Sequence, residues 1–206
     1  MLNPIPETHP LAKWIDLRNR VRQYDFMETA FQLWLDQNKP SLSAQFLQEL
    51  NFYAVHLLHP YPGQFRYDLK RDVDITNTPH TPPPWGEVED YMHDFFEKIE
   101  QFKFQNDPLM IGAYVLWRLN WIHPFMQGNG RTSRAISYFI MCQSIGYWLP
   151  GHPIVPELIK NTRDEYCHLL RDADAKVTSG NLTELAPIAN YLGRLLKAQL
   201  GSVSPS

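Results

Sequence analysis

Apolar residues recur at three- and four-residue steps along most of this chain, and proline or glycine ends several of the runs. This period places the apolar side chains on one face of an α-helix, whereas strands would show alternation. The pattern predicts helices over residues 25–38, 43–57, 85–102, 107–122, 129–145, 156–173 and 184–200. We therefore expect a mainly α protein, a helical bundle with one irregular segment.

Local end signals support several of these helices. Ser43 is a residue type that caps helix N-termini, and Asp107 followed by Pro108 combines a cap with a proline suited to the first turn. Gly146 follows the helix predicted over 129–145, where a glycine can adopt the left-handed conformation of a C-cap.

The irregular segment runs from Tyr61 to Pro84 and is rich in proline. Polar and apolar residues alternate from Asp72 to Ile75, which predicts a short strand. We expect this segment to form a small β-hairpin, or flap, beside the helices.

Composition narrows the class of protein. With 206 residues, 44% of them hydrophobic and 20% charged, the chain is expected to form one soluble domain with small appendages. A net charge of −3 without a basic block argues against a nucleic-acid partner. No signal peptide, membrane span or disulfide framework is expected, which favours the cytoplasm. We divide the chain into a helical extension (1–40), a core domain (41–200) and a disordered tail (201–206).

The stretch from His123 to Arg134 carries the clearest chemical signal. Gly128 and Gly130 flank Asn129 where a helix begins, and glycines let backbone N–H groups approach a ligand closely. The first N–H groups of a helix have no internal acceptor, and the helix dipole adds positive charge there. This combination predicts an anion site suited to phosphate.

Arginine and histidine side chains complete this predicted site. Arg134 lies one turn into the helix and can reach back over the glycines to hold a phosphate with its forked donors. His123 precedes Pro124, which disfavours the helical conformation, and a histidine fixed beside a phosphate is suited to act as a general base. Phe125 is expected to pin the loop in the core. Each feature alone is more often structural, so the prediction rests on their combination.

The pattern His-Pro-Phe-x-x-Gly-Asn-Gly-Arg-x-x-Arg resembles the signature of the Fic family. The resemblance extends upstream, because residues 63–66, 73–75 and 80–83 are similar to the flap that precedes the family's motif. It implies a Fic-like helical bundle and transfer of a nucleoside monophosphate, AMP from ATP as the first choice. The implied acceptor is a serine, threonine or tyrosine hydroxyl of a target protein.

The resemblance also implies a role for each matching residue. His123 would take the proton from the attacking hydroxyl. The donor phosphates would be held by Gly128, Asn129, Gly130, Arg131 and Arg134. The flap would pair with the target's main chain and so place its hydroxyl opposite the histidine. The implied flap residues are Phe65, Arg66, Val73 and Ile75.

One position departs from the family pattern. Gln127 stands where the family usually has the aspartate or glutamate that binds Mg²⁺, and an amide oxygen lacks the charge that attracts this cation. Three interpretations stay open: slow transfer with Mg·ATP, use of another metal or donor, or nucleotide binding without turnover. The last is a different class of function, a regulatory module.

Other hypotheses have weaker support. No P-loop pattern occurs, and His56 and His59 lack a third metal ligand at a readable spacing. The family's inhibitory Ser/Thr-x-x-x-Glu helix is also not found, because Gln45 precedes Glu49 and Gly180 precedes Glu184. An inhibitor on a separate protein therefore stays open.

Overall fold

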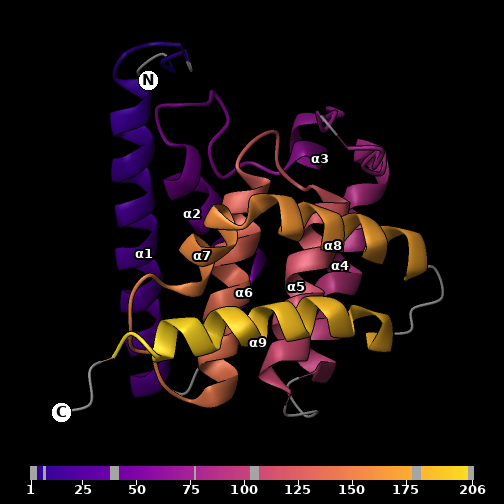
Figure 1. The fold of residues 1–206 in the computed structure, drawn as a ribbon. Coiled ribbons are helices and arrows are strands. Elements are labelled where there is room, and N and C mark those ends of the chain that lie inside the picture. The colour runs from indigo at the N-terminus through magenta and orange to yellow at the C-terminus, as the bar shows by residue number, and fades with distance from the viewer. Residues whose placement is uncertain are drawn as a thin grey trace.

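A computed structural model of the chain is built from α-helices (Figure 1). It describes residues 4–6, 8–37, 42–76, 78–102, 107–177 and 182–203. The elements in these ranges are α1 (Ala12–Gln37), α2 (Ala44–Val55), α3 (Arg66–Leu69), α4 (Trp85–Phe102), α5 (Pro108–Ile122), α6 (Asn129–Ile145), α7 (Val155–Asn161), α8 (Arg163–Lys176), the 3₁₀ helix η1 (Leu182–Leu185) and α9 (Ala186–Leu200). The predicted mainly α fold is confirmed.

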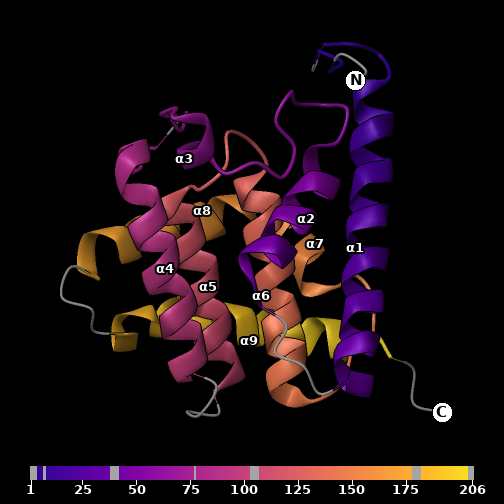
Figure 2. The same cartoon turned by 180° about the vertical axis from the view of Figure 1, so that it is seen from behind.

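Helices α5 and α6 form the centre of the protein, and the others pack around this pair (Figures 1 and 2). Gly112 of α5 permits the close approach, because a Cβ there would lie 2.7 Å from the sulfur of Met141. Helices α1 and α2 cover α6, α4 covers α5, and α9 crosses α5 and α7. The loop between α5 and α6 therefore lies at one end of the core, and it carries the motif.

Several predicted helix ends are confirmed. The Ser43 side chain accepts a hydrogen bond from Phe46 N at 3.1 Å. The Asp107 carboxylate accepts from the backbone N–H groups of Leu109 and Met110 at 3.1 and 3.0 Å. Gly146 ends α6 with φ +92°, the left-handed C-cap expected of a glycine.

Helix α1 is longer than the predicted 25–38. It begins at Ala12, and its first half exposes the apolar Trp14, Leu17 and Val21 but buries the polar Asn19 and Gln23. This arrangement obscures the helical period. The second half joins the common core, because Met27 and Phe31 are fully buried and Phe31 meets Phe139 of α6 edge-on. The predicted extension 1–40 thus packs on the core as far as it is described. Residues 1–3, 7 and 38–40 of this extension, and residues 204–206 of the predicted tail, lie outside the described ranges.

Two C-terminal helices differ from prediction. The helix expected over 156–173 is divided at Thr162, whose hydroxyl hydrogen-bonds Leu158 O at 2.9 Å and the Tyr191 hydroxyl at 2.7 Å. These contacts hold Thr162 at φ −111° and ψ 39°, outside the helical range, so α7 and α8 are separate. The last α-helix begins at Ala186 rather than Glu184, with Pro187 in its first turn, and η1 precedes it. No helix in the described ranges has both the length and the hydropathy of a membrane-spanning segment.

The predicted β-hairpin flap is wrong for the described residues. Residues 66–69 form the short helix α3, and residues 71–75 run without regular structure. The one β pairing recorded there is an isolated antiparallel bridge between Phe65 and Phe125. The aromatic rings of this pair stack at 4.8 Å, so the segment is held to the motif loop instead of to a second strand of its own.

Candidate active site

The motif loop is closed by the side chain of Asn129. Its Oδ1 accepts from Phe125 N at 2.9 Å, and its Nδ2 donates to Phe125 O at 2.7 Å. Phe125 is 1% exposed, as expected for a residue that pins the loop in the core. Because both polar ends of the Asn129 side chain serve the loop, a ligand could meet this residue only through its backbone N–H.

Asn51 of α2 holds the same loop from outside. Its Nδ2 donates to Gln127 O at 2.9 Å and to the Thr132 hydroxyl at 3.2 Å, while its Oδ1 accepts from Gly63 N at 3.0 Å. Asn51 is fully buried and joins α2, the segment before α3 and the motif. Sequence reasoning missed it, although a polar residue among the apolar positions of a predicted helix was an available signal.

His123 is the C-cap of α5 and adopts the left-handed conformation, with φ 53° and ψ 58°. As predicted from Pro124, His123 lies outside the right-handed helical conformation. Its conformation is left-handed rather than extended. Its ring Nδ1 lies 3.2 Å from Asn120 O. A carbonyl oxygen only accepts, so Nδ1 carries the hydrogen and Nε2 of the neutral ring keeps its lone pair.

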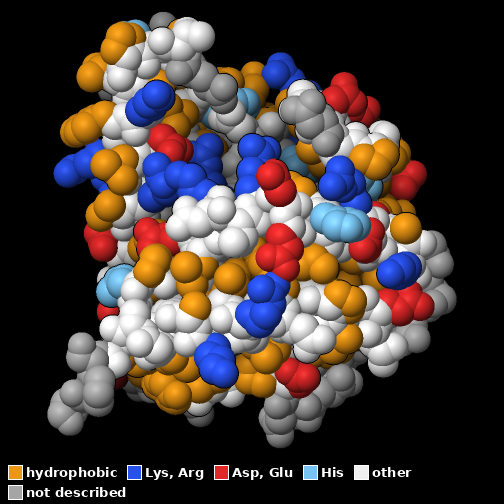
Figure 3. Space-filling view, in the orientation of Figure 1, with side chains coloured by type: hydrophobic (Ala, Val, Ile, Leu, Met, Phe, Trp, Pro, Cys, Tyr) orange, Lys and Arg blue, Asp and Glu red, His pale blue; other side chains and the backbone are white. Residues whose placement is uncertain are grey.

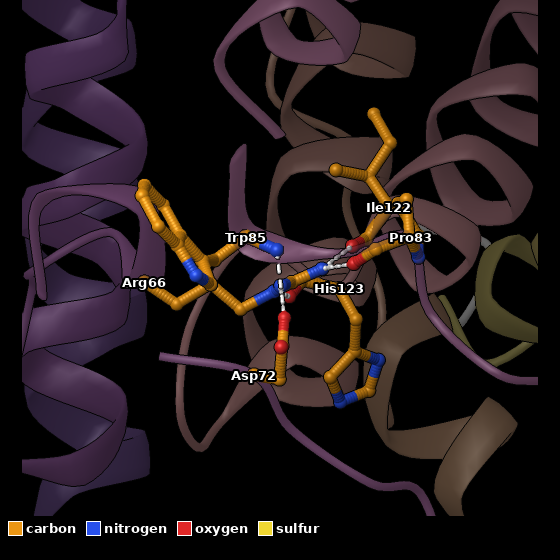
Figure 4. Close-up of polar contacts among 6 residues, drawn as sticks. All are labelled: Arg66, Asp72, Pro83, Trp85, Ile122 and His123. Carbon is orange, nitrogen blue, oxygen red and sulfur yellow. Dashed lines mark hydrogen bonds and ion pairs between the residues drawn. The ribbon is translucent and has the colours of Figure 1, made fainter. Parts of the chain in front are cut away.

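Arg66 fixes the backbone at this turn (Figure 4). Its guanidinium donates to His123 O at 2.8 Å, to Ile122 O at 3.2 Å and to Pro83 O. It also lies 3.5 Å from the Asp72 carboxylate, which accepts from Trp85 N at 2.7 Å. Figure 4 shows the His123 imidazole pointing away from this guanidinium. Arg66 therefore neutralises the carbonyl end of α5 and sets the direction of the histidine.

The buried position of Arg66 limits how the predicted flap residues can contact a target protein. Phe65 and Arg66 are 1% and 0% exposed, so their side chains are closed to a target protein, and the main-chain docking implied for them stays a prediction. Val73 and Ile75 are half-buried, and Ile75 lines the cavity beside His123. Target docking by the segment around these two residues stays a prediction.

A cavity of about 260 Å³ opens beside His123. Gly130 and Arg134 line it with the histidine, and Arg134 Nη1 lies 3.2 Å from the position that a Cβ on Gly130 would take. Arg134 thus folds back over the start of α6, as the sequence predicted. Residues that were not predicted complete much of the wall, among them His80, Asn120, Trp121, Tyr166 and Asp174.

Four other motif residues do not line the cavity beside His123. Gln127 and Arg131 line a neighbouring cavity, and Gly128 and Asn129 line neither. Gly128 has φ +82° and faces α2, where an added Cβ would lie 2.5 Å from Val55. Position 128 requires glycine because its backbone is left-handed and because it packs closely against α2. This turn leads the loop into α6. The backbone N–H groups of residues 129–131 begin α6 and have no acceptor within the helix.

Burial lowers the pKa of His123 to about 4; the hydrogen bond to the Asn120 carbonyl opposes the shift, and the nearby charges of Arg66 and His80 add to it. We expect the ring to stay neutral from neutral pH down to about pH 5 and to titrate near 4. Because the unfolded chain binds this proton more readily, His123 should destabilise the fold as pH falls from 6.5 toward 4. NMR titration of the ring, assigned by its absence in His123→Asn, measures this, and a midpoint above 6 would contradict it.

Gly130→Val should weaken nucleotide binding by at least about tenfold, because the new side chain displaces Arg134 from the start of α6. Titration with a nucleotide measures the effect. Gly86→Val is the matched control: Gly86 is also the second residue of its helix, α4, and nothing lies within 4 Å of its added Cβ. Equal affinity in two folded variants would argue against a phosphate at Gly130.

The residues around Gln127 do not fit a protein-held Mg²⁺ site. Among the described residues, no three carboxylate, histidine or cysteine side chains gather where they could hold a metal ion. The one carboxylate in the cavity that Gln127 lines is Asp16, and it is paired with Arg20 at 2.9 Å and with Arg131. A hard divalent cation favours several oxygens and negative charge, which this wall does not offer.

Gln127→Glu should therefore create a dependence on Mg²⁺ that the natural protein lacks or shows weakly. The added carboxylate supplies the charge that attracts the cation. Initial rates of transfer measured against Mg²⁺ concentration test this, with Gln101→Glu on an exposed part of α4 as the control of equal charge. If the Mg²⁺ dependence of Gln127→Glu matches that of the natural protein, residue 127 does not contact the metal.

Comparison with known proteins finds matches over the region that carries this site. Residues 41–141 match the model of the Fic/DOC family. A curated relative from Drosophila persimilis, "Protein adenylyltransferase Fic", is 32% identical over 98 residues, and the relative of the same name from Drosophila willistoni is 31% identical over 98 residues. Each match covers 46% of this chain and 18% of the relative. The aligned region is therefore less than a fifth of those proteins.

Solved structures share the fold over nearly the whole chain. A Fic domain containing signaling protein from Bacteroides thetaiotaomicron has a TM-score of 0.75 at 19% identity, covering 94% of this chain and 72% of its own. Fic-1 from C. elegans has a TM-score of 0.68 at 20% identity, covering 98% of this chain and 53% of its own. With the motif, the bundle that carries it and the family match all in agreement, this chain belongs to the Fic/DOC family.

Proposed function

We propose that this protein transfers a nucleoside monophosphate, AMP from ATP as the first candidate, to a hydroxyl side chain of a target protein. One observation carries the proposal: His123 keeps a lone pair on Nε2 and lines the same cavity as Gly130 and Arg134. A base can take the proton of an attacking hydroxyl, and a helix N-terminus and an arginine can stabilise the charge on the phosphate. The name shared by the Drosophila relatives supports the choice of reaction.

Each residue of the site has a distinct role in this reaction. The target hydroxyl attacks the α-phosphorus while its proton passes to His123 Nε2. Backbone N–H groups at the start of α6 and the Arg134 guanidinium stabilise the charge on the phosphate oxygens. Asn120 and Arg66 hold the histidine by its ring and by its carbonyl. The target segment lies along residues 71–75, beside Val73 and Ile75, with its serine, threonine or tyrosine facing the base.

Incubation with α-labelled ATP and cell lysate tests this function, with labelled GTP, UTP and CTP in parallel and with Mg²⁺ or Mn²⁺ present. We expect labelled protein bands that disappear with His123→Asn. This variant preserves a residue type that tolerates the left-handed conformation and removes the base.

The neutral Gln127 favours a second candidate, a nucleotide-binding module that regulates a partner without transfer. Nucleotide binding by calorimetry without labelled bands from any donor would support this candidate and reject the enzyme.

A further inference from the structure

A strongly cationic cavity lies beside the one that His123 lines. It has a volume of about 450 Å³, within the range of about 300–1,000 Å³ typical of small-molecule sites. Three elements supply its polar wall: α1, the motif and α7. The polar lining residues are Lys13, Asp16, Arg20, Gln127, Arg131 and Lys160. Figure 3 shows lysine and arginine side chains gathered on this face between α1 and α7.

Positive charge exceeds negative charge in this wall. Asp16 is shared by Arg20 and Arg131, whose side chains are only 28% and 21% exposed. Lys13 and Lys160 add two cations, and neither has a carboxylate within ion-pair distance among the residues that the structure describes. The Arg20 Nε is buried without a hydrogen-bond partner in the described structure. Such a wall, in a chain of net charge −3, favours a small ligand with several negative charges.

Arginine side chains lie between the cationic cavity and the cavity beside His123. A small cavity of about 20 Å³ shares Arg20, Arg131 and Lys160 with the larger one, and Glu157, whose carboxylate accepts from Ile154 N at 3.3 Å, also lines it. It also includes Arg134, which lines the cavity of His123. Arg20, Arg131 and Arg134 therefore lie between a phosphate at the start of α6 and the wall that carries Lys13 and Lys160.

We propose that the cationic cavity binds the outer phosphates of the donor and then the leaving pyrophosphate, with Lys13, Arg20 and Lys160 supplying charge that a protein-held metal ion does not. The proposal rests on the transferase function. It follows from the poor fit of the Gln127 wall to Mg²⁺ and from the surplus of cations in the same wall.

The bonds and charges of the step balance. The target oxygen forms a bond to the α-phosphorus, and the bond from that phosphorus to the bridging oxygen breaks. The pyrophosphate leaves with the electron pair, and the hydroxyl proton goes to His123. Charge therefore grows on the outer phosphates as the bond breaks, and cations placed there stabilise the transition state more than the bound donor.

Calorimetry with inorganic pyrophosphate in EDTA tests the site directly. We expect the natural protein to bind pyrophosphate without a divalent cation, and Lys13→Gln with Lys160→Gln to weaken this binding at least about tenfold. The matched control is Lys98→Gln with Lys176→Gln, which removes the same charge from exposed positions on α4 and α8. The control should bind as the natural protein does.

Two results overturn the inference: no binding of pyrophosphate by the natural protein in EDTA, or equal affinity in the Lys13/Lys160 pair and the natural protein. Failure of the transferase function looks different. If no labelled donor modifies a protein but the Lys13→Gln, Lys160→Gln double variant still binds pyrophosphate more weakly than the natural protein, the anion site stands and the proposed reaction is wrong. If transfer requires His123 but neither its rate nor pyrophosphate affinity changes in the lysine pair, the reaction stands and this site is wrong.

Discussion

Replacing His123 with alanine should lower the rate of transfer about a hundred- to ten-thousand-fold, the usual cost of losing a general base. Nucleotide affinity should change little, because the ring bonds to Asn120 O rather than to the phosphate positions at the start of α6. Transfer of labelled AMP and nucleotide titration on the same preparation separate these two quantities.

Two further variants make this result specific to the base. His123→Asn keeps a side chain suited to the left-handed backbone, so a loss of rate there is not due to a disturbed turn. His168→Ala removes an exposed histidine of α8 and should transfer at the natural rate. Transfer by both His123 variants at the natural rate would show that another group takes the proton.

Arg66→Met should reduce the free energy of unfolding by about 3–5 kcal/mol, as expected when one partner of a buried polar network is removed. Methionine fills much of the space but leaves the carbonyls of Pro83, Ile122 and His123 without their donor. The exposed Asp72 can turn to water, so the buried carbonyls account for most of the loss. Urea unfolding at equilibrium measures it.

Arg71→Met is the matched control for Arg66. Arg71 is exposed and lies 4.9 Å from the centre of the Tyr61 ring, a contact worth about 0.5–1 kcal/mol at a surface. The two variants lose the same charge, so the difference between them reports the buried hydrogen bonds. Equal stability of Arg66→Met and Arg71→Met would mean that the carbonyl contacts contribute nothing. Where Arg66→Lys folds, its transfer should still be impaired, since one ammonium cannot replace the planar fork.

The sequence by itself determined the features that depend on neighbouring residues. The ends of α5 and α6 followed from Asp107, Pro108 and Gly146, because caps and left-handed glycines act within a few residues. The position of His123 beside Gly130 and Arg134 also followed from sequence, since a short loop joins the two helices that carry them. The family pattern was recognisable for the same reason.

Only the tertiary structure decided which distant residues complete the site. Arg66 and His123 are 57 positions apart, and Asp16 and Arg131 are 115 apart. No local period encodes such pairs. The hairpin prediction failed for this reason: alternation at residues 72–75 suggested a strand, but Phe65 pairs with Phe125 and the Arg66 side chain lies inside the protein. The start of α1 was hidden because apolar residues occupy exposed positions there, while the polar Asn19 and Gln23 occupy buried ones. Packing on α2 and α6 then decided that the first helix joins the core and brings Lys13, Asp16 and Arg20 to the motif.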